Sequence, residues 1–161
     1  MSYAIVYHSR TGNTAQLAQA IREALPPADC LYFGPPGDAQ ALAADTLYVG
    51  FWTDKGTCDE ELSRFLQSLT HQRVFLFGTA GFGGAPDYFA QILARVKENL
   101  PATVQVVGTY MCQGKMPPAV RARYVAMEDS PRRTAMLANF DQALTHPDQE
   151  DLARLQALVA P

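Results

Sequence analysis

The sequence predicts an α/β fold, in which a doubly wound sheet of five parallel strands has helices on both faces. Five short segments rich in apolar, β-branched and aromatic residues are typical of strands; they are residues 3–8, 30–33, 46–52, 73–79 and 104–112. Apolar residues at helical spacing predict helices over residues 14–25, 58–69 and 86–100. This alternation is typical of parallel strands joined by right-handed crossovers, in which ligands bind beyond the carboxyl ends of the strands.

Local signals support each element in turn. The first strand stops at a cluster of Ser, Thr, Gly and Asn, and Pro26 and Pro27 stop the helix that follows. Segment 46–52 is almost wholly apolar, as expected of a strand that is covered on both faces. The helix over 86–100 opens with Pro in its first turn. The inward stripes that we expect are Leu17, Ala20, Ile21, Ala24 and Leu25, then Leu62, Phe65, Leu66 and Leu69, then Phe89, Ile92, Leu93 and Val96.

Residues 113–147 form a C-terminal elaboration of what we expect to be one domain over residues 1–161. Helical spacing predicts three further helices, over residues 118–127, 130–144 and 148–159. Ser130 and Pro131 are a cap followed by a first-turn proline. The expected inward residues are Met136, Leu137, Phe140 and Leu144, then Leu152, Leu155, Leu158 and Val159. We expect the last helix, or the one before it, to pack on the sheet.

Composition excludes several classes of protein. The first residues lack the basic and long apolar regions of a signal peptide, and no apolar run approaches the length of a membrane span. We therefore expect a cytoplasmic protein without a membrane partner. The three cysteines and three histidines are scattered, which favours free thiols over disulfides and argues against a metal site. The net charge of −3 is mild, and we expect no nucleic-acid partner.

The loop between the first strand and the first helix is the strongest functional signal. It consists of Ser9, Arg10, Thr11, Gly12, Asn13 and Thr14. Its hydroxyl and amide side chains, with the N–H groups of a helix N-terminus, can hold a phosphate without a lysine. The patterns G-x-x-x-x-G-K-[ST] and G-x-G-x-x-G are absent, so neither a nucleoside triphosphatase nor an ordinary NAD-binding domain is favoured. A polar turn that merely caps a helix is the alternative.

Residues 3–14 resemble the start of a flavodoxin, whose FMN phosphate loop has the pattern [S/T]-x-T-G-x-T. Ser9, Thr11, Gly12 and Thr14 match every specified position. The resemblance implies a flavodoxin-like sheet of order 2-1-3-4-5, one non-covalently bound FMN, and transfer of one or two electrons.

In flavodoxins the flavin ring lies between the loops after strands three and four. The resemblance implies that the ring-binding residues are Trp52, Thr53, Asp54, Lys55 and Gly56, with Thr79, Ala80, Gly81, Phe82, Gly83 and Gly84. Trp52, the only tryptophan, and Phe82 suit stacking on a flat heterocycle. The Lys55–Gly56 peptide is a candidate partner for flavin N5, with Thr53–Asp54 as the alternative. Lys55 beside the ring would raise the potential of the second reduction step, although a solvated loop charge is the alternative.

Charge is concentrated after the fifth strand. Residues 113–135 carry Lys115, Arg121, Arg123, Arg132 and Arg133 against Glu128 and Asp129, a net charge of +3. We expect this segment to flank the flavin and to contact an anionic substrate or an acidic redox partner protein; a solvated helical face is the alternative.

A receiver domain would share this fold. Asp54, Thr79 and Lys115 occupy plausible positions for one, but His8 and Ser9 stand where its acidic pair should be, so that Mg²⁺ has no site. Two functions remain. We expect a monomeric electron carrier that serves a partner oxidoreductase, because no obvious residue triad for acid–base chemistry lies near the flavin loops and the chain is short with no long insertion; no catalytic residue is assigned. The alternatives are an NAD(P)H-dependent flavin oxidoreductase acting on a quinone or other small acceptor, and a binding module without flavin.

Overall fold

The computed structural model of the chain describes residues 1–83 and 86–161. Its centre is a parallel five-stranded sheet of order β2-β1-β3-β4-β5, which confirms the predicted fold class and strand order. The strands are β1 (Tyr3–Tyr7), β2 (Cys30–Gly34), β3 (Thr46–Trp52), β4 (Arg73–Ala80) and β5 (Gln105–Gln113). All five run in one direction, so the loops that follow β1, β3, β4 and β5 meet at one edge of the sheet.

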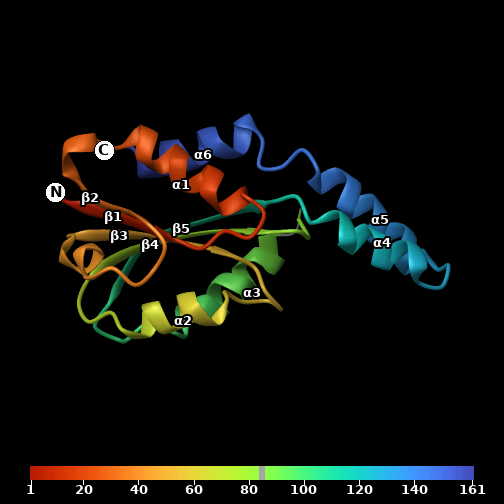
Figure 1. Ribbon diagram of the computed structural model, residues 1–161, viewed down its shortest axis with the longest axis horizontal. Coiled ribbons are helices and arrows are strands. Elements are labelled where there is room, and N and C mark those ends of the chain that lie inside the picture. The colour runs from red at the N-terminus through yellow and green to blue at the C-terminus, as the bar shows by residue number, and fades with distance from the viewer. Residues whose placement is uncertain (84–85) are drawn as a thin grey trace.

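Helices cover both faces of the sheet (Figure 1). On one face lie α1 (Asn13–Ala24) and α6 (Gln149–Val159), and on the other lie α2 (Glu60–Gln67) and α3 (Pro86–Lys97). Two short 3₁₀ segments, η1 (Pro27–Asp29) and η2 (Ala39–Ala43), flank β2 and were not predicted. In η2 the Asp38 side chain accepts the N–H of Gln40 at 2.7 Å, so a local turn replaces the crossover helix between β2 and β3.

Each face of the sheet has its own apolar core. The α2/α3 face buries Leu62, Leu66, Ile92 and Val96 as predicted. The α1/α6 face buries Leu17, Ile21, Leu155 and Val159. It is therefore the last helix that packs on the sheet, beside α1. The prediction for Leu158 was wrong, because this residue lies on the outer side of α6 and is 58% exposed.

Reciprocal glycine–phenylalanine pairs join the two central strands β3 and β4. Gly50 pairs with Phe77 and Phe51 pairs with Gly78. A Cβ atom at either glycine would overlap the ring of the opposing phenylalanine, and both rings are almost fully buried. The missing side chains thus make room for the two rings between the sheet and its helices.

The two remaining helices, α4 (Pro118–Ala126) and α5 (Pro131–Ala143), form a hairpin that projects from the edge of the sheet where β5 ends (Figure 1). Ser130 caps α5, as predicted, by accepting the N–H of Arg133 at 3.1 Å. Phe140 is buried, but the inward prediction for Leu144 was wrong, because it is 50% exposed at the base of the hairpin. The hairpin reaches beyond the sheet, so its apolar positions lack a full covering layer.

No helix in the described ranges 1–83 and 86–161 combines the length and the apolar character needed to cross a membrane.

Candidate functional site

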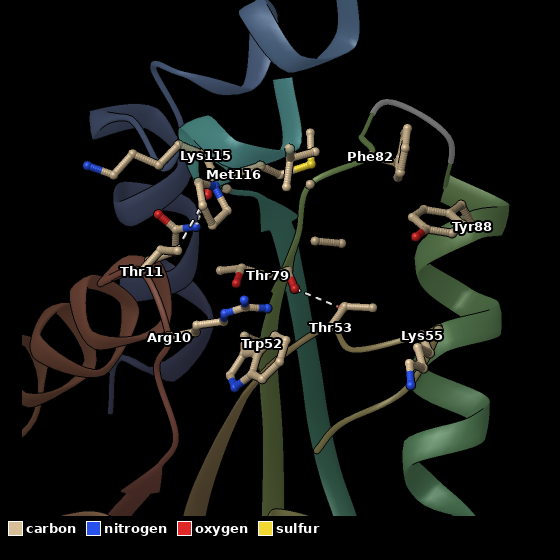
Figure 2. Close-up of a pocket in the computed structure, with 17 residues that line it drawn as sticks. Arg10, Thr11, Trp52, Thr53, Lys55, Thr79, Phe82, Tyr88, Lys115 and Met116 are labelled. Atoms are coloured by element: carbon tan, nitrogen blue, oxygen red, sulfur yellow. Dashed lines mark hydrogen bonds between the residues drawn. The ribbon is translucent and has the colours of Figure 1, made fainter. Parts of the chain in front are cut away.

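A cavity of about 290 Å³ lies at the edge of the sheet where the strands end (Figure 2). It brings together segments from four loops that are far apart in the sequence. Its predicted members are Arg10, Thr11, Asn13, Trp52, Thr53, Lys55, Gly56, Thr79, Ala80, Gly81 and Phe82. Its other members are Tyr88, Gly114, Lys115, Met116, Pro117 and Val120. The site therefore lies where a parallel sheet of this order is expected to bind a ligand.

The N-terminus of α1 is open toward ligands. Gly12 precedes the helix with φ of 90° and, as the N-cap residue, has no side chain with which to cap it. The N–H of Ala15 is bound by Ser9 Oγ at 3.3 Å, whereas no acceptor within the described part of the chain is found for the N–H groups of Gly12, Asn13 and Thr14. These donors and the positive end of the helix dipole suit an anion.

Asn13 carries an unpaired polar atom beside this helix end. Its Nδ2 donates to the carbonyl of Lys115 at 2.8 Å, but its Oδ1 is buried without a partner among the described residues. A Cβ at Gly114 would overlap the Asn13 amide, so this glycine permits the close approach of the loop after β5. A ligand with a hydrogen-bond donor would satisfy Oδ1, because a buried polar atom without a partner destabilises the protein.

Other predicted residues of the phosphate loop lie around the cavity rather than in it. Ser9 and Gly12 line a neighbouring shallow groove with Tyr7, His8, Ala15 and Pro35. Thr14 is fully buried, and its Oγ1 donates to the carbonyl of Phe51 at 3.1 Å. Its hydroxyl therefore joins the start of α1 to the end of β3.

After β3, the chain makes a tight turn from Asp54 to Thr57. The backbones of these two residues exchange hydrogen bonds of 2.7 and 3.1 Å, and Lys55 and Gly56 between them have φ of 51° and 85°. Positive φ at both central residues is the pattern of a type I′ turn. Arg95 of α3 donates to the carbonyl of Gly56 at 3.3 Å. Asp54 is not among the residues that line the cavity, and which peptide would face flavin N5 stays a prediction.

Trp52 stands at the start of this loop, half-buried in the wall of the cavity. The guanidinium carbon of Arg10 lies 5.3 Å from the centre of its indole ring, a cation–π arrangement. Thr53 follows it and is tied to the next strand, since both its N–H and its Oγ1 donate to the carbonyl of Thr79 at 3.0 and 2.8 Å. These ties fix the loops after β3 and β4 relative to each other.

The loop after β4 is held by the end of β5 and by the hairpin. The carbonyl of Gly81 accepts from Nε2 of Gln113 at 3.0 Å and from Nδ2 of Asn139 at 3.1 Å. A Cβ at Gly81 would overlap Met116, which therefore covers this loop from the side of β5. Phe82 is 40% exposed and meets Tyr88 edge-to-face, with ring centres 6.5 Å apart.

One predicted member of this loop that the structure describes is not brought into the cavity. Gly83 does not line it, because the side chain of Gln113 fills the space beside its Cα. Gly84 lies outside the described residues.

Six cavity residues were not in the sequence-based set. Gly114, Lys115, Met116 and Pro117 lie in the loop after β5, which the strand order alone marks as a site loop. Tyr88 comes from the first turns of α3, and burial raises the pKa of its hydroxyl. Val120 comes from α4. The sequence does not indicate that Tyr88 and Val120 belong to the site. Both lie in helices, and it is the placement of those helices in the folded chain that brings the two residues to the cavity.

The electrostatic character of the cavity is cationic. Arg10, Lys55 and Lys115 line it, and no carboxylate is found among its described residues. A phosphate at the start of α1 and a flat ring between Trp52 and Phe82 both fit the residues present. The donors at Gly12 to Thr14, the unpaired Asn13 Oδ1 and the aromatic walls are therefore compatible with FMN.

Comparisons with known proteins agree with this geometry. The family model described as "Flavodoxin domain" matches residues 4–160. A "Flavodoxin-like domain-containing protein BilS" from Clostridium symbiosum is 41% identical over 176 aligned positions, which cover 97% of this chain and 93% of that protein. A protein of the same description from Clostridioides difficile is 26% identical, with coverage of 94% and 90%.

Solved structures resemble the fold at low sequence identity. Oxidised flavodoxin 2 from Bacillus cereus superposes with a TM-score of 0.61 at 16% identity, covering 99% of this chain and 95% of its own. A flavoprotein in complex with FMN from Lactobacillus acidophilus superposes with a TM-score of 0.53 at 15% identity, covering 69% and 93%. At these identities the likeness establishes the fold alone.

Proposed function

This chain belongs to the flavodoxin family, and from that premise we propose that it binds one FMN and carries electrons to a partner oxidoreductase. The observation that carries the proposal is the cavity that joins the open N-terminus of α1 to two aromatic walls. FMN, when bound, accepts and donates electrons one or two at a time. The protein contributes the anion site, the stacking surfaces and the cationic surroundings.

The residues divide into two groups by role. The phosphate would be held by two kinds of donor: the N–H groups of Gly12, Asn13 and Thr14, and the hydroxyls of Ser9 and Thr11. Trp52 and Phe82 would flank the ring, and Arg10, Lys55 and Lys115 would favour a negative charge on the reduced cofactor.

Titration of the protein with FMN and with riboflavin tests the phosphate site. We expect one equivalent of FMN to bind, with quenching of flavin fluorescence. Ser9→Asp keeps an acceptor for the N–H of Ala15 but adds a negative charge at the start of α1. This variant should weaken FMN binding at least tenfold, which corresponds to about 1.4 kcal/mol, and leave riboflavin, which has no phosphate, unchanged. Failure of the unmodified protein to bind FMN would refute the proposal.

Reduction of the bound flavin distinguishes a carrier from an enzyme. A carrier should accept electrons in two separate one-electron steps during a potentiometric titration and react slowly with NADPH alone. Rapid bleaching of the flavin by NADPH would instead support the NAD(P)H-dependent oxidoreductase.

The hairpin supports an acidic partner protein. Two of its cations are used internally, because Arg121 binds Asp141 at 3.0 Å, and Arg133 donates to the carbonyls of Tyr124 and Val125 at 3.1 Å each. Arg123 and Arg132 are exposed, and no ion pair is found for either in the described part of the chain. Val125 and Met127 add exposed apolar surface on the same hairpin. Cations around apolar residues suit an acidic protein surface.

The charge of this surface can be tested by measuring the rates at which the reduced protein passes electrons to two acceptors of opposite charge, one small and one a protein. Arg123→Glu combined with Arg132→Glu should slow electron transfer to ferricyanide, an anion, by about threefold or more at low salt, and speed transfer to the basic protein cytochrome c. The control pair Arg73→Glu and Lys97→Glu changes net charge equally at the opposite edge of the sheet. Equal effects of the two pairs would refute a docking role for the hairpin.

We also propose that the protein is a monomer and that it is located in the cytoplasm. Cys58 and Cys112 are buried free thiols, and burial raises the pKa of both, so neither is a reactive thiolate. Sedimentation of the FMN-loaded protein tests the oligomeric state.

A further inference from the structure

Trp52 is held from behind the cavity by a residue that does not line it. Its indole Nε1 donates to Oδ2 of Asp59 at 3.1 Å, and Figure 2 shows this nitrogen turned away from the cavity. The same carboxylate oxygen is hydrogen-bonded to Nδ1 of His8, at the end of β1. The other oxygen, Oδ1, accepts the N–H of Leu62 at 2.9 Å, so Asp59 is also the N-cap of α2. One side chain thus joins the ends of β1 and β3 to the start of α2.

The surroundings hold this carboxylate in one orientation. The Asp59 side chain is only 14% exposed, and both of its oxygens accept hydrogen bonds. The remaining nitrogen of His8, Nε2, faces Glu61 Oε2 of α2 at 3.5 Å, and the Arg10 guanidinium lies over the Trp52 ring. Hydrogen bonds to a charged acceptor are about twice as strong as those between neutral groups. The indole is therefore anchored at its only polar atom.

We propose that Asp59 and His8 are positioning residues of the flavin site, which fix the plane of Trp52 so that its ring forms a ready wall for the isoalloxazine. This inference rests on the proposed FMN site. A ring that is fixed before the ligand arrives loses less conformational freedom on binding, and this raises affinity without a new contact. Neither Asp59 nor His8 lines the cavity, so their effect on a flavin ring there passes through Trp52; His8 also lines the neighbouring groove with Ser9 and Gly12.

Asp59→Asn separates the anchoring role from the capping role. Asn is as good an N-cap as Asp, so the bond to Leu62 can persist. Its second polar atom is then an NH₂ group, which cannot accept from the indole, and an indole N–H has no acceptor capacity of its own. We expect the Kd for FMN to rise about tenfold. In the protein without FMN, the emission of Trp52, the only tryptophan, should shift to longer wavelength, and its near-ultraviolet circular dichroism should weaken.

Substitutions of His8 provide a graded test. The amide nitrogen of Asn can take the position of Nδ1 and still donate to Asp59, so His8→Asn should keep the Kd and the emission near those of the unmodified protein. His8→Leu removes the donor and should change both in the direction of Asp59→Asn. The matched control is Asp148→Asn, which makes the same chemical change at the N-cap of α6 and should leave both readouts unchanged.

Each outcome bears on the proposal. Unchanged Kd and emission in Asp59→Asn would overturn it, and so would equal losses in Asp59→Asn and Asp148→Asn, which would show that the effect is not specific to the Trp52 anchor. Failure of the unmodified protein to bind FMN would refute the proposed function. In that case the Trp52 emission without FMN still decides whether Asp59 and His8 hold the indole.

Discussion

The sheet with its four covering helices and the α4–α5 hairpin are stabilised by different kinds of contact. The sheet buries two continuous apolar cores. The hairpin buries only Tyr124, Phe140 and Ala143 among its helical residues, and polar ties fasten it: Arg121 to Asp141 within it, and Asn139 to the carbonyl of Gly81 outside it. Apolar periodicity therefore predicts the sheet region well. The position of the hairpin relative to the sheet depends instead on hydrogen bonds between side chains and backbone, which leave no recognisable pattern in the sequence.

The same substitution in the two regions should have very different effects. Leu66→Ala removes a fully buried side chain of α2 and should lower the free energy of unfolding by about 2–5 kcal/mol. Leu144→Ala, at the base of the hairpin and half exposed, should change it by less than about 0.5 kcal/mol. Urea denaturation of both variants measures the difference. Comparable losses would mean that the hairpin shares the core of the sheet.

A second substitution tests the close fit between the central strands. Gly50→Ala adds a methyl group where the ring of Phe77 lies, and overpacking of this kind should cost about 1–3 kcal/mol of unfolding free energy. Combining it with Phe77→Leu should recover part of that loss, because a smaller side chain leaves room. The denaturation midpoints of the two single variants and the double variant provide the test. Simple addition of the two losses would contradict the reciprocal fit.

The tie between the hairpin and the loop after β4 should have a smaller effect. Asn139→Ala removes one of two donors to the Gly81 carbonyl and should cost about 1 kcal/mol, with faster hydrogen exchange of the hairpin amides. Gln142→Ala, an exposed neighbour on the same helix, is the control. If exchange in the sheet rises as much as exchange in the hairpin, Asn139 does not act locally.

The smallest effect should come from the ion pair within the hairpin. The hydrogen bond from Arg121 lowers the pKa of the exposed Asp141 below its usual 3.8. Stability from this pair is present above the pKa of the unfolded chain and is lost as pH falls through the lower folded-state value. Asp141→Asn should therefore speed exchange of the hairpin amides at neutral pH and differ little from the unmodified protein in strong acid. A difference that persists in acid would assign it to something other than the charge.

The fold could be predicted nearly in full because its central strands β1, β3 and β4 are mostly buried and its helices carry single apolar stripes. The boundaries shift by one to three residues, and η2 was missed because a side-chain cap from Asp38, not periodicity, forms it. Leu158 and Leu144 were assigned inward on spacing alone, and spacing does not reveal whether a neighbouring element covers a residue.

The site could be predicted where residues follow a strand directly. Trp52, Thr79 and Phe82 line the cavity because parallel strands end at one edge. Tyr88 and Val120 could not be found, since only the path of α3 and α4 turns them toward it. The anchoring of Trp52 by Asp59 was also beyond the sequence, because the six intervening residues give no sign that the two side chains meet.

The chain enters and leaves the hairpin at nearly one point. The N–H of Lys115 donates to the carbonyl of His146 at 3.0 Å, so two residues on either side of the hairpin are already in contact. Replacement of residues 117–145 by a short linker would therefore close a small gap at little entropic cost, leaving β5 joined to α6. Under the docking role proposed for it, the hairpin would be an exchangeable adaptor on a constant flavodoxin-like scaffold. A graft of another hairpin at this junction would, under the same proposal, change the choice of partner, while only Pro117 and Val120 would be lost from the wall of the cavity.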